Sequence, residues 1–441
     1  MNAHTTGRKQ TRPYVGDVAR MPSGGLGKAS VTIGLVLLAL IVGFVIGMGV
    51  YLVMNLSTWL TDLLWNGVGK AIGAFWVPLL FCTVGGIVIG IWTKVSHDTV
   101  KPLEEVMAEF KETGSYRVNG PWKPVITFLL PLVFGGSIGF EAGLTGLITA
   151  GCCWIRDQLK KAGLRLADVT DTTIAAAMAA IFGTPLAGIV AGTESGPNVS
   201  DYDMRRGAKI VLYMAAAFGA FAGVRVVSAV FGVSGGLPRF DEIAASPPQY
   251  LWAVPCIAIA YAMTLLFHAS RWLFGIVGVR VRKSEAGIVA APIMCGVVMG
   301  AIACILPYVL FPGETQSEEL METWSGFTAM ALIATGLLKA VITPMCINMG
   351  WVGGDLFPSI FAGVAVGYGL ASLTGADPML MVTVTTTAFL AGVVRKPLLV
   401  LGILFLCFPA DGIIWMGIAA VVGASLPIPS ALMSNSGASH K

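Results

Sequence analysis

Three acidic residues lie deep within apolar stretches of this 441-residue chain: Glu141, Glu194 and Asp355. A charged side chain is costly inside a membrane, so an acid in such a place usually serves a function. Glu141 follows the glycine-rich segment 135–139 and precedes an apolar helical stretch, whose first N–H groups favour a negative charge. We expect its carboxylate to satisfy these donors until an anion replaces it, and protonation to release it. The alternative is a glutamate that only caps the helix.

Asp355 repeats this design later in the chain. It follows Gly353 and Gly354, and Pro358 lies near the start of the helix that we expect after it. Two helix starts of this kind, facing each other, would bind an anion through backbone N–H groups alone. The sequence leaves two roles open for Asp355, which are capping its own helix and contributing a charge.

Glu194 and two basic residues complete the set of deep charges. Glu194 ends the helical run 185–193 and is either a proton relay or, as we favour, a structural acid bound to donors of the nearby loop. Lys339 and Arg225 are the deep cations. Lys339 can pair with an acid or attract anions, but we favour a side chain that extends to the membrane interface.

No residue pattern indicates an enzyme or a metal site. The four histidines are scattered, and the eight cysteines lie in or beside apolar stretches without the spacing of metal ligands. We therefore expect no enzymatic activity, no metal and no cofactor. The 28 basic and 24 acidic residues are spread over short loops, which is typical of topology signals and not of a nucleic-acid surface.

Composition indicates which elements position these residues. Hydrophobic residues make up 56% of the chain and charged residues 12%. Soluble proteins carry about 25% charged residues, so a soluble core is excluded, and the apolar content excludes disorder. The 55 glycines suit tightly packed or interrupted transmembrane helices. We predict an all-α polytopic membrane protein.

The loops predict how the chain crosses the membrane. Basic residues gather before residue 31, in 94–124 and 156–171, and in a group formed by Arg271, Arg280, Arg282 and Lys283. The segment 312–323 holds four glutamates and no basic residue. Because basic loops favour the cytoplasmic side, we place them and the N-terminus in the cytoplasm and 312–323 outside.

A weak internal repeat suggests two structural halves, which we expect to be inverted; chance similarity between glycine-rich apolar segments is the alternative. The segment 136–141 is echoed by 350–355, and Pro185-Leu186 by Pro397-Leu398, at nearly equal offsets close to half the chain. Broken helices in matching places point to a binding site near the bilayer midplane. The expected divisions are a basic tail (1–30), the first membrane half (31–210), the second membrane half (211–433) and a short tail (434–441).

Four segments resemble motifs of the CLC family of chloride channels and proton/anion antiporters, in the family's order. The segments 139–143, 181–189, 354–358 and 394–398 resemble the family's G-[RK]-E-G-P, F-N-A-P-L-A-G, G-x-F-x-P and R-A-P-L stretches. The resemblance covers roughly residues 31–433 and is that of a divergent member of the prokaryotic type. No long tail follows this region, so we expect the nucleotide-binding modules of some relatives to be absent.

The resemblance implies a homodimer with one anion pathway in each subunit. Glu141 is then the gating glutamate and, if protons are coupled to transport, the external proton acceptor. The anion-binding groups that the resemblance implies are the backbone N–H groups of Gly139, Phe140, Ala142, Asp355 and Leu356, and the hydroxyl of Thr99.

The chain departs from the family pattern at several positions. Phe140 and Gly143 replace the basic residue and the proline beside the glutamate. Ser195 stands where antiporters have an inner proton-transfer glutamate, one position after Glu194, and Pro429 stands in place of a late tyrosine. These departures favour a channel-like protein or the family's fluoride/proton branch, which also lacks that glutamate.

We therefore predict a multi-pass protein of the cell membrane that transports small inorganic anions, chloride first, with or without protons. The main alternative is a fluoride/proton antiporter of the same family, and nitrate also stays open as a substrate. Two further alternatives are a proton-coupled carrier of an organic or cationic solute and a membrane scaffold or sensor that transports nothing.

Overall fold

A computed structural model describes residues 25–96, 123–144, 148, 172–195, 206–231 and 237–433, and every regular element within these ranges is a helix. Seven helices of this part of the chain are long and apolar enough to cross a membrane. Shorter apolar helices of 10–17 residues accompany them. The all-α, multi-pass architecture predicted from composition is confirmed.

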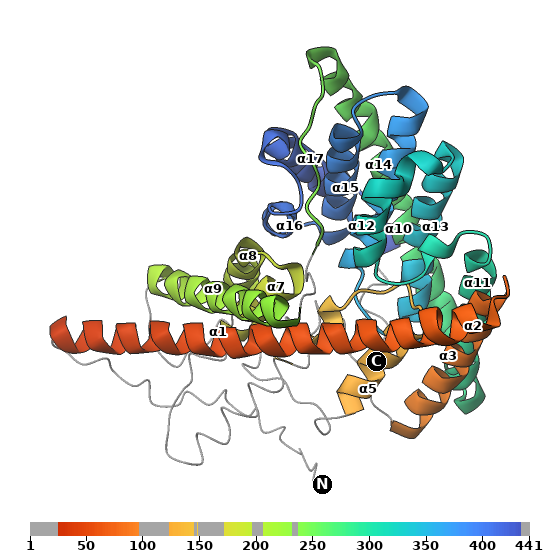
Figure 1. Cartoon of the computed structure of the whole chain (residues 1–441), viewed down its shortest axis with the longest axis horizontal. Helices are drawn as coiled ribbons and strands as arrows, with labels where there is room; N and C mark the ends of the chain where they lie inside the picture. The colour runs from red at the N-terminus through yellow and green to blue at the C-terminus, as the bar shows by residue number, and fades with distance from the viewer. Residues whose placement is uncertain are drawn as a thin grey trace, which may run out of the picture.

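The described residues of the first part of the chain form three long helices and four shorter ones. They are α1 (Gly25–Asp62), α2 (Lys70–Ile72), α3 (Val77–Ser96), α5 (Lys123–Val133), α7 (Thr172–Phe182), α8 (Pro185–Ser195) and α9 (Arg206–Phe231), with a π-helical turn at Leu63–Gly69. In Figure 1, α1 extends across the width of the molecule with α9 beside it. Gly43 and Gly47 of α1 bring its backbone against that of Ala216 and Ala220, because a Cβ at either glycine would collide with α9.

The second part forms most of the remaining body. Its helices are α10 (Ala253–Val281), α11 (Glu285–Ala303), α12 (Glu314–Thr323), α13 (Ala329–Asn348), α14 (Leu356–Thr374), α15 (Pro378–Val394), α16 (Pro397–Leu404), α17 (Ile413–Ser425) and α18 (Ser430–Met433). Nearly every residue of α14 and α15 is buried, and these two helices pack against each other (Figure 1). A buried α14 allows its first residues to form a site away from lipid.

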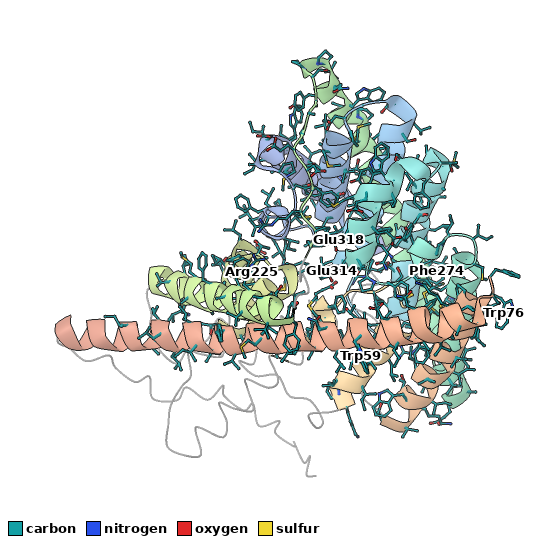
Figure 2. The ribbon with its side chains drawn as sticks, in the orientation of Figure 1. Trp59, Trp76, Arg225, Phe274, Glu314 and Glu318 are labelled. Carbon is teal, nitrogen blue, oxygen red and sulfur yellow. The ribbon has the colours of Figure 1, made fainter. Side chains whose placement is uncertain are left out.

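The outside of the molecule is apolar, as a lipid-facing surface requires. Trp59 and Trp76 project outward near the end of the long N-terminal helix and are 61% and 44% exposed (Figure 2). Tryptophan is enriched where a membrane protein meets the headgroups of the bilayer. Arg225, expected to lie deep in the membrane, is exposed on the surface of α9 within the candidate span Lys209–Phe231.

Two broken helices occur at the matching positions of the internal repeat. Between α7 and α8 the chain turns at Gly183, with φ of 64°, and between α15 and α16 it turns at Arg395, with φ of 61°. A proline begins the second helix of each pair, at Pro185 and Pro397. Because proline lacks an N–H and is favoured at the first helical position, both breaks follow from the sequence.

The expected division at residue 210 falls inside a helix. α9 runs without a break from Arg206 to Phe231, and α1 already begins at Gly25. The expected short tail, 434–441, lies outside the described residues. The exact limits of the two halves stay a prediction.

Candidate anion-binding site

Two glycine turns from the two parts of the chain meet directly. The first follows α5 and the second follows α13, and each begins with a left-handed glycine, Gly135 (φ 87°) and Gly350 (φ 99°). Gly139 N–H donates to Gly354 O at 2.7 Å, and Gly354 N–H donates to Gly139 O at 2.9 Å. This antiparallel bridge joins the two segments that the repeat analysis matched.

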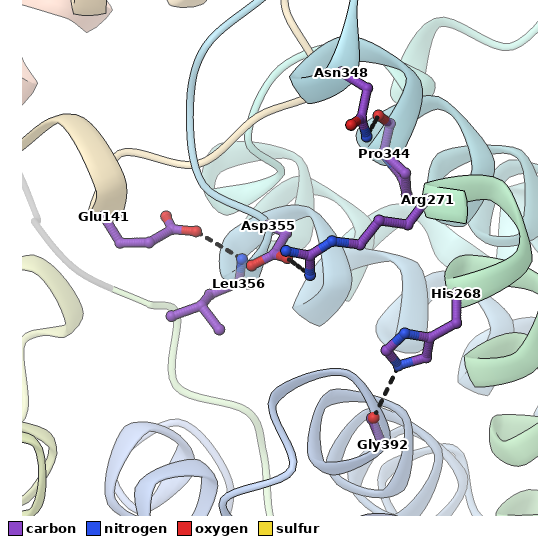
Figure 3. A network of polar contacts seen from close by, with 8 residues as sticks. All are labelled: Glu141, His268, Arg271, Pro344, Asn348, Asp355, Leu356 and Gly392. Atoms are coloured by element: carbon purple, nitrogen blue, oxygen red, sulfur yellow. Dashed lines mark hydrogen bonds and ion pairs between the residues drawn. The ribbon is translucent and has the colours of Figure 1, made fainter. Parts of the chain in front are cut away.

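The Glu141 side chain reaches from the first turn to the start of α14. Its Oε1 accepts a hydrogen bond from Leu356 N–H at 2.6 Å (Figure 3). The residue is 1% exposed, and its other oxygen, Oε2, is buried without a hydrogen-bond partner in the described part of the chain. A buried carboxylate with one satisfied oxygen is costly, and the partial positive charge of a helix N-terminus stabilises it.

Glycine is required on both sides of this carboxylate. A Cβ added to Gly139 or Gly354 would overlap the carboxylate oxygens of Glu141. The backbone therefore approaches the charge closely enough to surround it with peptide groups. The carboxylate binds the N-terminus of a helix from the other part of the chain, so any capping by Glu141 extends beyond its own helix.

Four buried phenylalanine side chains pack together beside the site. Phe140 meets Phe357 edge to face, with ring centroids 5.8 Å apart. Phe182 stacks on the ring of Phe357, with centroids 5.0 Å apart. Phe128 packs against Phe140 at 6.3 Å, and all four side chains are buried. Electrostatic interactions are stronger in such a dry environment than in water.

The first turn is anchored by α13. Ser137 Oγ and Thr343 Oγ1 are 3.1 Å apart and share a hydrogen bond. Lys339, one helical turn before Thr343, is fully buried and donates to the carbonyl groups of residues 308–311, with the shortest bonds, 2.8 Å, to Leu310 O and Phe311 O. Phe311 N–H in turn donates to Gly135 O at 3.2 Å.

This arrangement overturns the expectation that Lys339 extends to the membrane interface. Backbone carbonyl groups replace the water that the ammonium group would otherwise seek, and the ring of Phe361 lies 4.8 Å from Nζ. The side chain holds the loop before α12 against the glycine turn.

Asp355 is the N-cap residue of α14, but its side chain makes no capping hydrogen bond. Its Oδ2 instead lies 3.7 Å from Arg271 Nη1 (Figure 3). Arg271 was counted with a basic loop, which is wrong because it lies inside α10. The sequence held a signal for this ion pair: Arg271 lies within the apolar run 250–276, and a cation at membrane depth usually has an acidic partner.

The remaining expected site residues are placed as follows. Gly139 N–H, expected to bind an anion, is used by the bridge to Gly354. Glu194 Oε2 lies 3.8 Å from Lys396 Nζ, which favours the structural role. Phe140 and Ala142 are buried beside Glu141. Thr99 and the side chain of Ser195 lie outside the described residues.

A cavity of about 420 Å³ leads from the surface toward the site. Phe140, Leu132 and Phe311 form its apolar part, and Asp62, Glu314 and Glu319 contribute acidic side chains. Glu314 begins α12 and lies in the expected outer segment 312–323 (Figure 2). The cavity therefore lowers the local concentration of anions and raises that of protons.

Known proteins resemble this chain in both sequence and fold. The family model described as voltage gated chloride channel matches residues 85–427, which include both glycine turns and both broken helices. A chloride channel protein of Arabidopsis thaliana, CLC-e, is 24% identical to this chain over an alignment of 437 residues in length. The alignment covers 83% of this chain. The match covers 56% of that relative, so the chain spans about half the length of the relative.

Solved structures support the same relationship at the level of fold. A CLC-type fluoride/proton antiporter superposes with a TM-score of 0.71 at 16% identity, over 92% of this chain and 98% of the other. A slow cyanobacterial Cl⁻/H⁺ antiporter gives a TM-score of 0.69 at 14% identity, over 92% and 95% of the two chains. The predicted fold of two inverted halves with broken helices is confirmed, and the chain belongs to the voltage-gated chloride channel (CLC) family.

Proposed function

We propose that this protein moves small monovalent inorganic anions across a membrane, with chloride as the first substrate and Glu141 as the gate. One observation carries the proposal: the buried carboxylate of Glu141 lies on the Leu356 N–H group that begins α14. The start of a helix binds negatively charged groups, so the carboxylate occupies a place where an anion can bind. A free anion of similar charge can take its place.

Exchange between the carboxylate and an anion gives a two-state gate. With Glu141 ionised and bound to Leu356 N–H, the site is occupied and the pathway is closed. Protonation removes the charge that the helix N-terminus favours, so the side chain leaves and an anion enters. Transport therefore rises as the pH falls, and the buried Oε2, which lacks a partner, is the atom that takes the proton.

The donors for the transported anion are backbone groups around the same point. We propose the N–H groups of Leu356, Asp355, Phe140 and Ala142, together with the hydroxyl of Thr99. Peptide N–H groups sense charge and approximate size but form no rigid cage for one ion. Several small monovalent anions should therefore pass.

Fluoride/proton exchange is the second candidate. The edge of an aromatic ring carries partial positive charge, and Phe140 and Phe357 are the sequence neighbours of Glu141 and Leu356. The two rings are in edge-to-face contact, with centroids 5.8 Å apart, next in sequence to the proposed donors. Similarity to a fluoride/proton antiporter gives this candidate further weight.

Proton coupling is proposed to be weak when chloride is the substrate. Glu194, the one acid near the expected inner position, already has Lys396 as an ionic partner. This contact gives Glu194 a structural role, and the position that we expect to relay protons in antiporters is Ser195, which has no carboxyl group. We also propose that the protein is a homodimer with one pathway in each subunit. Its N-terminus is proposed to lie in the cytoplasm.

The direct test is ion flux from liposomes that contain the purified protein. Chloride, fluoride and nitrate efflux are recorded together with external pH, and sodium efflux serves as the control. The proposal expects anion efflux without sodium efflux. Sodium flux without anion flux would reject it, and the absence of any flux would favour a scaffold or sensor.

A further inference from the structure

Three sulfur atoms meet in the core where α11 packs against α13 (Figure 1). Cys346 Sγ of α13 lies 3.7 Å from Cys295 Sγ and 3.6 Å from Met299 Sδ, and the latter two residues belong to α11. Cys295 and Met299 are one helical turn apart, so they share a face of their helix. All three side chains are at most 1% exposed, and both cysteines are free thiols. Two thiols and one thioether therefore converge in a site that is closed to solvent.

The chemistry of these donors selects the kind of ligand. Thiolate and thioether sulfurs are soft donors, which bind Cu(I), whereas Mg²⁺, Ca²⁺ and Mn²⁺ prefer oxygen. A monovalent ion held by one thiolate, one thiol and one thioether makes a complex without net charge, which suits an apolar interior. Binding forms metal–sulfur bonds, and the proton that one thiol loses leaves to solvent. No electron is transferred, so the ion keeps its oxidation state.

The sulfur positions fit an ion with three ligands. Three sulfurs at about 2.3 Å from one ion, in a trigonal plane, lie about 4.0 Å from one another. The two printed separations therefore need to widen only slightly. Structural zinc takes four ligands from cysteine, histidine and carboxylate side chains. Among the residues that the structure describes, no three side chains of these types are grouped for a metal ion, so the methionine donor favours Cu(I) over zinc.

The packing holds the sulfurs in place before an ion binds. Trp351 N–H donates to Cys346 O at 2.9 Å, and Trp351 Nε1 donates to Pro292 O of α11, also at 2.9 Å. This fully buried tryptophan ties the end of α13 to the helix that carries the other two sulfurs. Donors on such fixed elements bind an ion at a lower cost in conformational entropy.

We propose that Cys295, Met299 and Cys346 form a binding site for a soft monovalent metal ion, Cu(I), which fixes α11 to α13. The site goes beyond the proposed anion transport and does not depend on it. Sequence spacing did not indicate it, because the two thiols are 51 positions apart and the third donor is a methionine. The packed fold brings these donors together.

Two further thiols extend the soft region toward the surface. Gly300 follows Met299 directly, and Cys304 Sγ lies 3.3 Å from Gly300 O. A Cβ on Gly300 would lie 3.1 Å from Cys82 Cβ, so the Cys82 side chain packs at the same point. Because Cys304 is only partly buried, it gives the ion a first sulfur contact at the end of α11.

The test is Cu(I) binding to the full chain purified in detergent, with ascorbate as reductant and without oxygen. Binding is measured by competition with a chromophoric Cu(I) chelator. C295S/C346S removes both thiols of the site, and C256S/C407S is the matched control, because it removes two buried thiols elsewhere. We expect the wild type and C256S/C407S to bind one ion per chain more than C295S/C346S binds. Equal binding by the wild type and C295S/C346S, or no binding by the wild type, would overturn the proposal.

M299L keeps the test decisive if C295S/C346S does not fold. Leucine has nearly the volume of methionine and leaves both thiols in place, so the core is retained. We expect M299L to bind Cu(I) at least about 10–100-fold more weakly, since loss of a mere supporting residue at a metal site has an effect of this size. Cu(I) should also raise the unfolding temperature of the wild type more than that of M299L. An M299L variant with the affinity and the temperature shift of the wild type would overturn the proposal.

Discussion

Replacing Lys339 by methionine should destabilise the protein, although the substitution leaves an apolar side chain in an apolar environment. The ammonium group is fully buried and donates at 2.8 Å to both Leu310 O and Phe311 O. Methionine fills the volume but leaves these carbonyl groups without a donor. Each buried acceptor that loses its partner costs about 1–3 kcal/mol, so two short bonds set a range of about 2–6 kcal/mol.

The substitution also removes a charged ammonium group from the interior. Because burying that charge is itself unfavourable, its removal offsets part of the loss of stability. We therefore expect a net loss of about 3 kcal/mol, in the lower half of the range set by the two carbonyl groups. The assay is thermal or denaturant unfolding of the purified protein in detergent. Lys70→Met, at an exposed lysine, is the matched control. A K339M variant as stable as K70M would refute the reasoning.

Three further outcomes follow from the site. Gly354→Ala places a methyl group where the Glu141 carboxylate lies, so it should displace the gate and remove the pH dependence of anion flux. A unit charge acting over about 10 Å in water is worth about 0.4 kcal/mol, so removing two acidic charges from the cavity in E314Q/E319Q should raise flux about threefold at about 10 mM salt and not at about 1 M. Wild-type liposomes under a chloride gradient at controlled voltage should show weak or no uphill proton uptake, and Glu194→Gln should behave identically, because Glu194 pairs with Lys396, the residue before α16, in a structural role.

The sequence was sufficient for the helical fold and for the pairing of the two glycine turns. Glycines at the two repeated segments and prolines after each helix break are local signals, and each corresponds to a turn or a helix start in the structure. The depth of Glu141 followed from its apolar surroundings. Which N–H it binds did not follow, because that contact joins residues from opposite parts of the chain.

The polar contacts that support the site were harder to predict. Lys339 was assigned to the interface because an unpaired lysine usually extends to water, yet the carbonyl groups that bind it come from a separate loop. Arg271 was grouped with nearby loop arginines, although the helix continues to Val281. Both errors have one cause: a deep cation has many possible partners, and only the packed fold selects among them.

The central claim is that the Glu141 carboxylate closes the anion pathway by occupying the start of α14. Its most direct test is the pH dependence of chloride efflux in Glu141→Gln, compared with Glu318→Gln, a matched change at an exposed residue of α12. We predict that wild type and E318Q transport faster as the pH falls, and that E141Q transports at a high rate independent of pH. An E141Q variant that retains the wild-type pH dependence would contradict the claim.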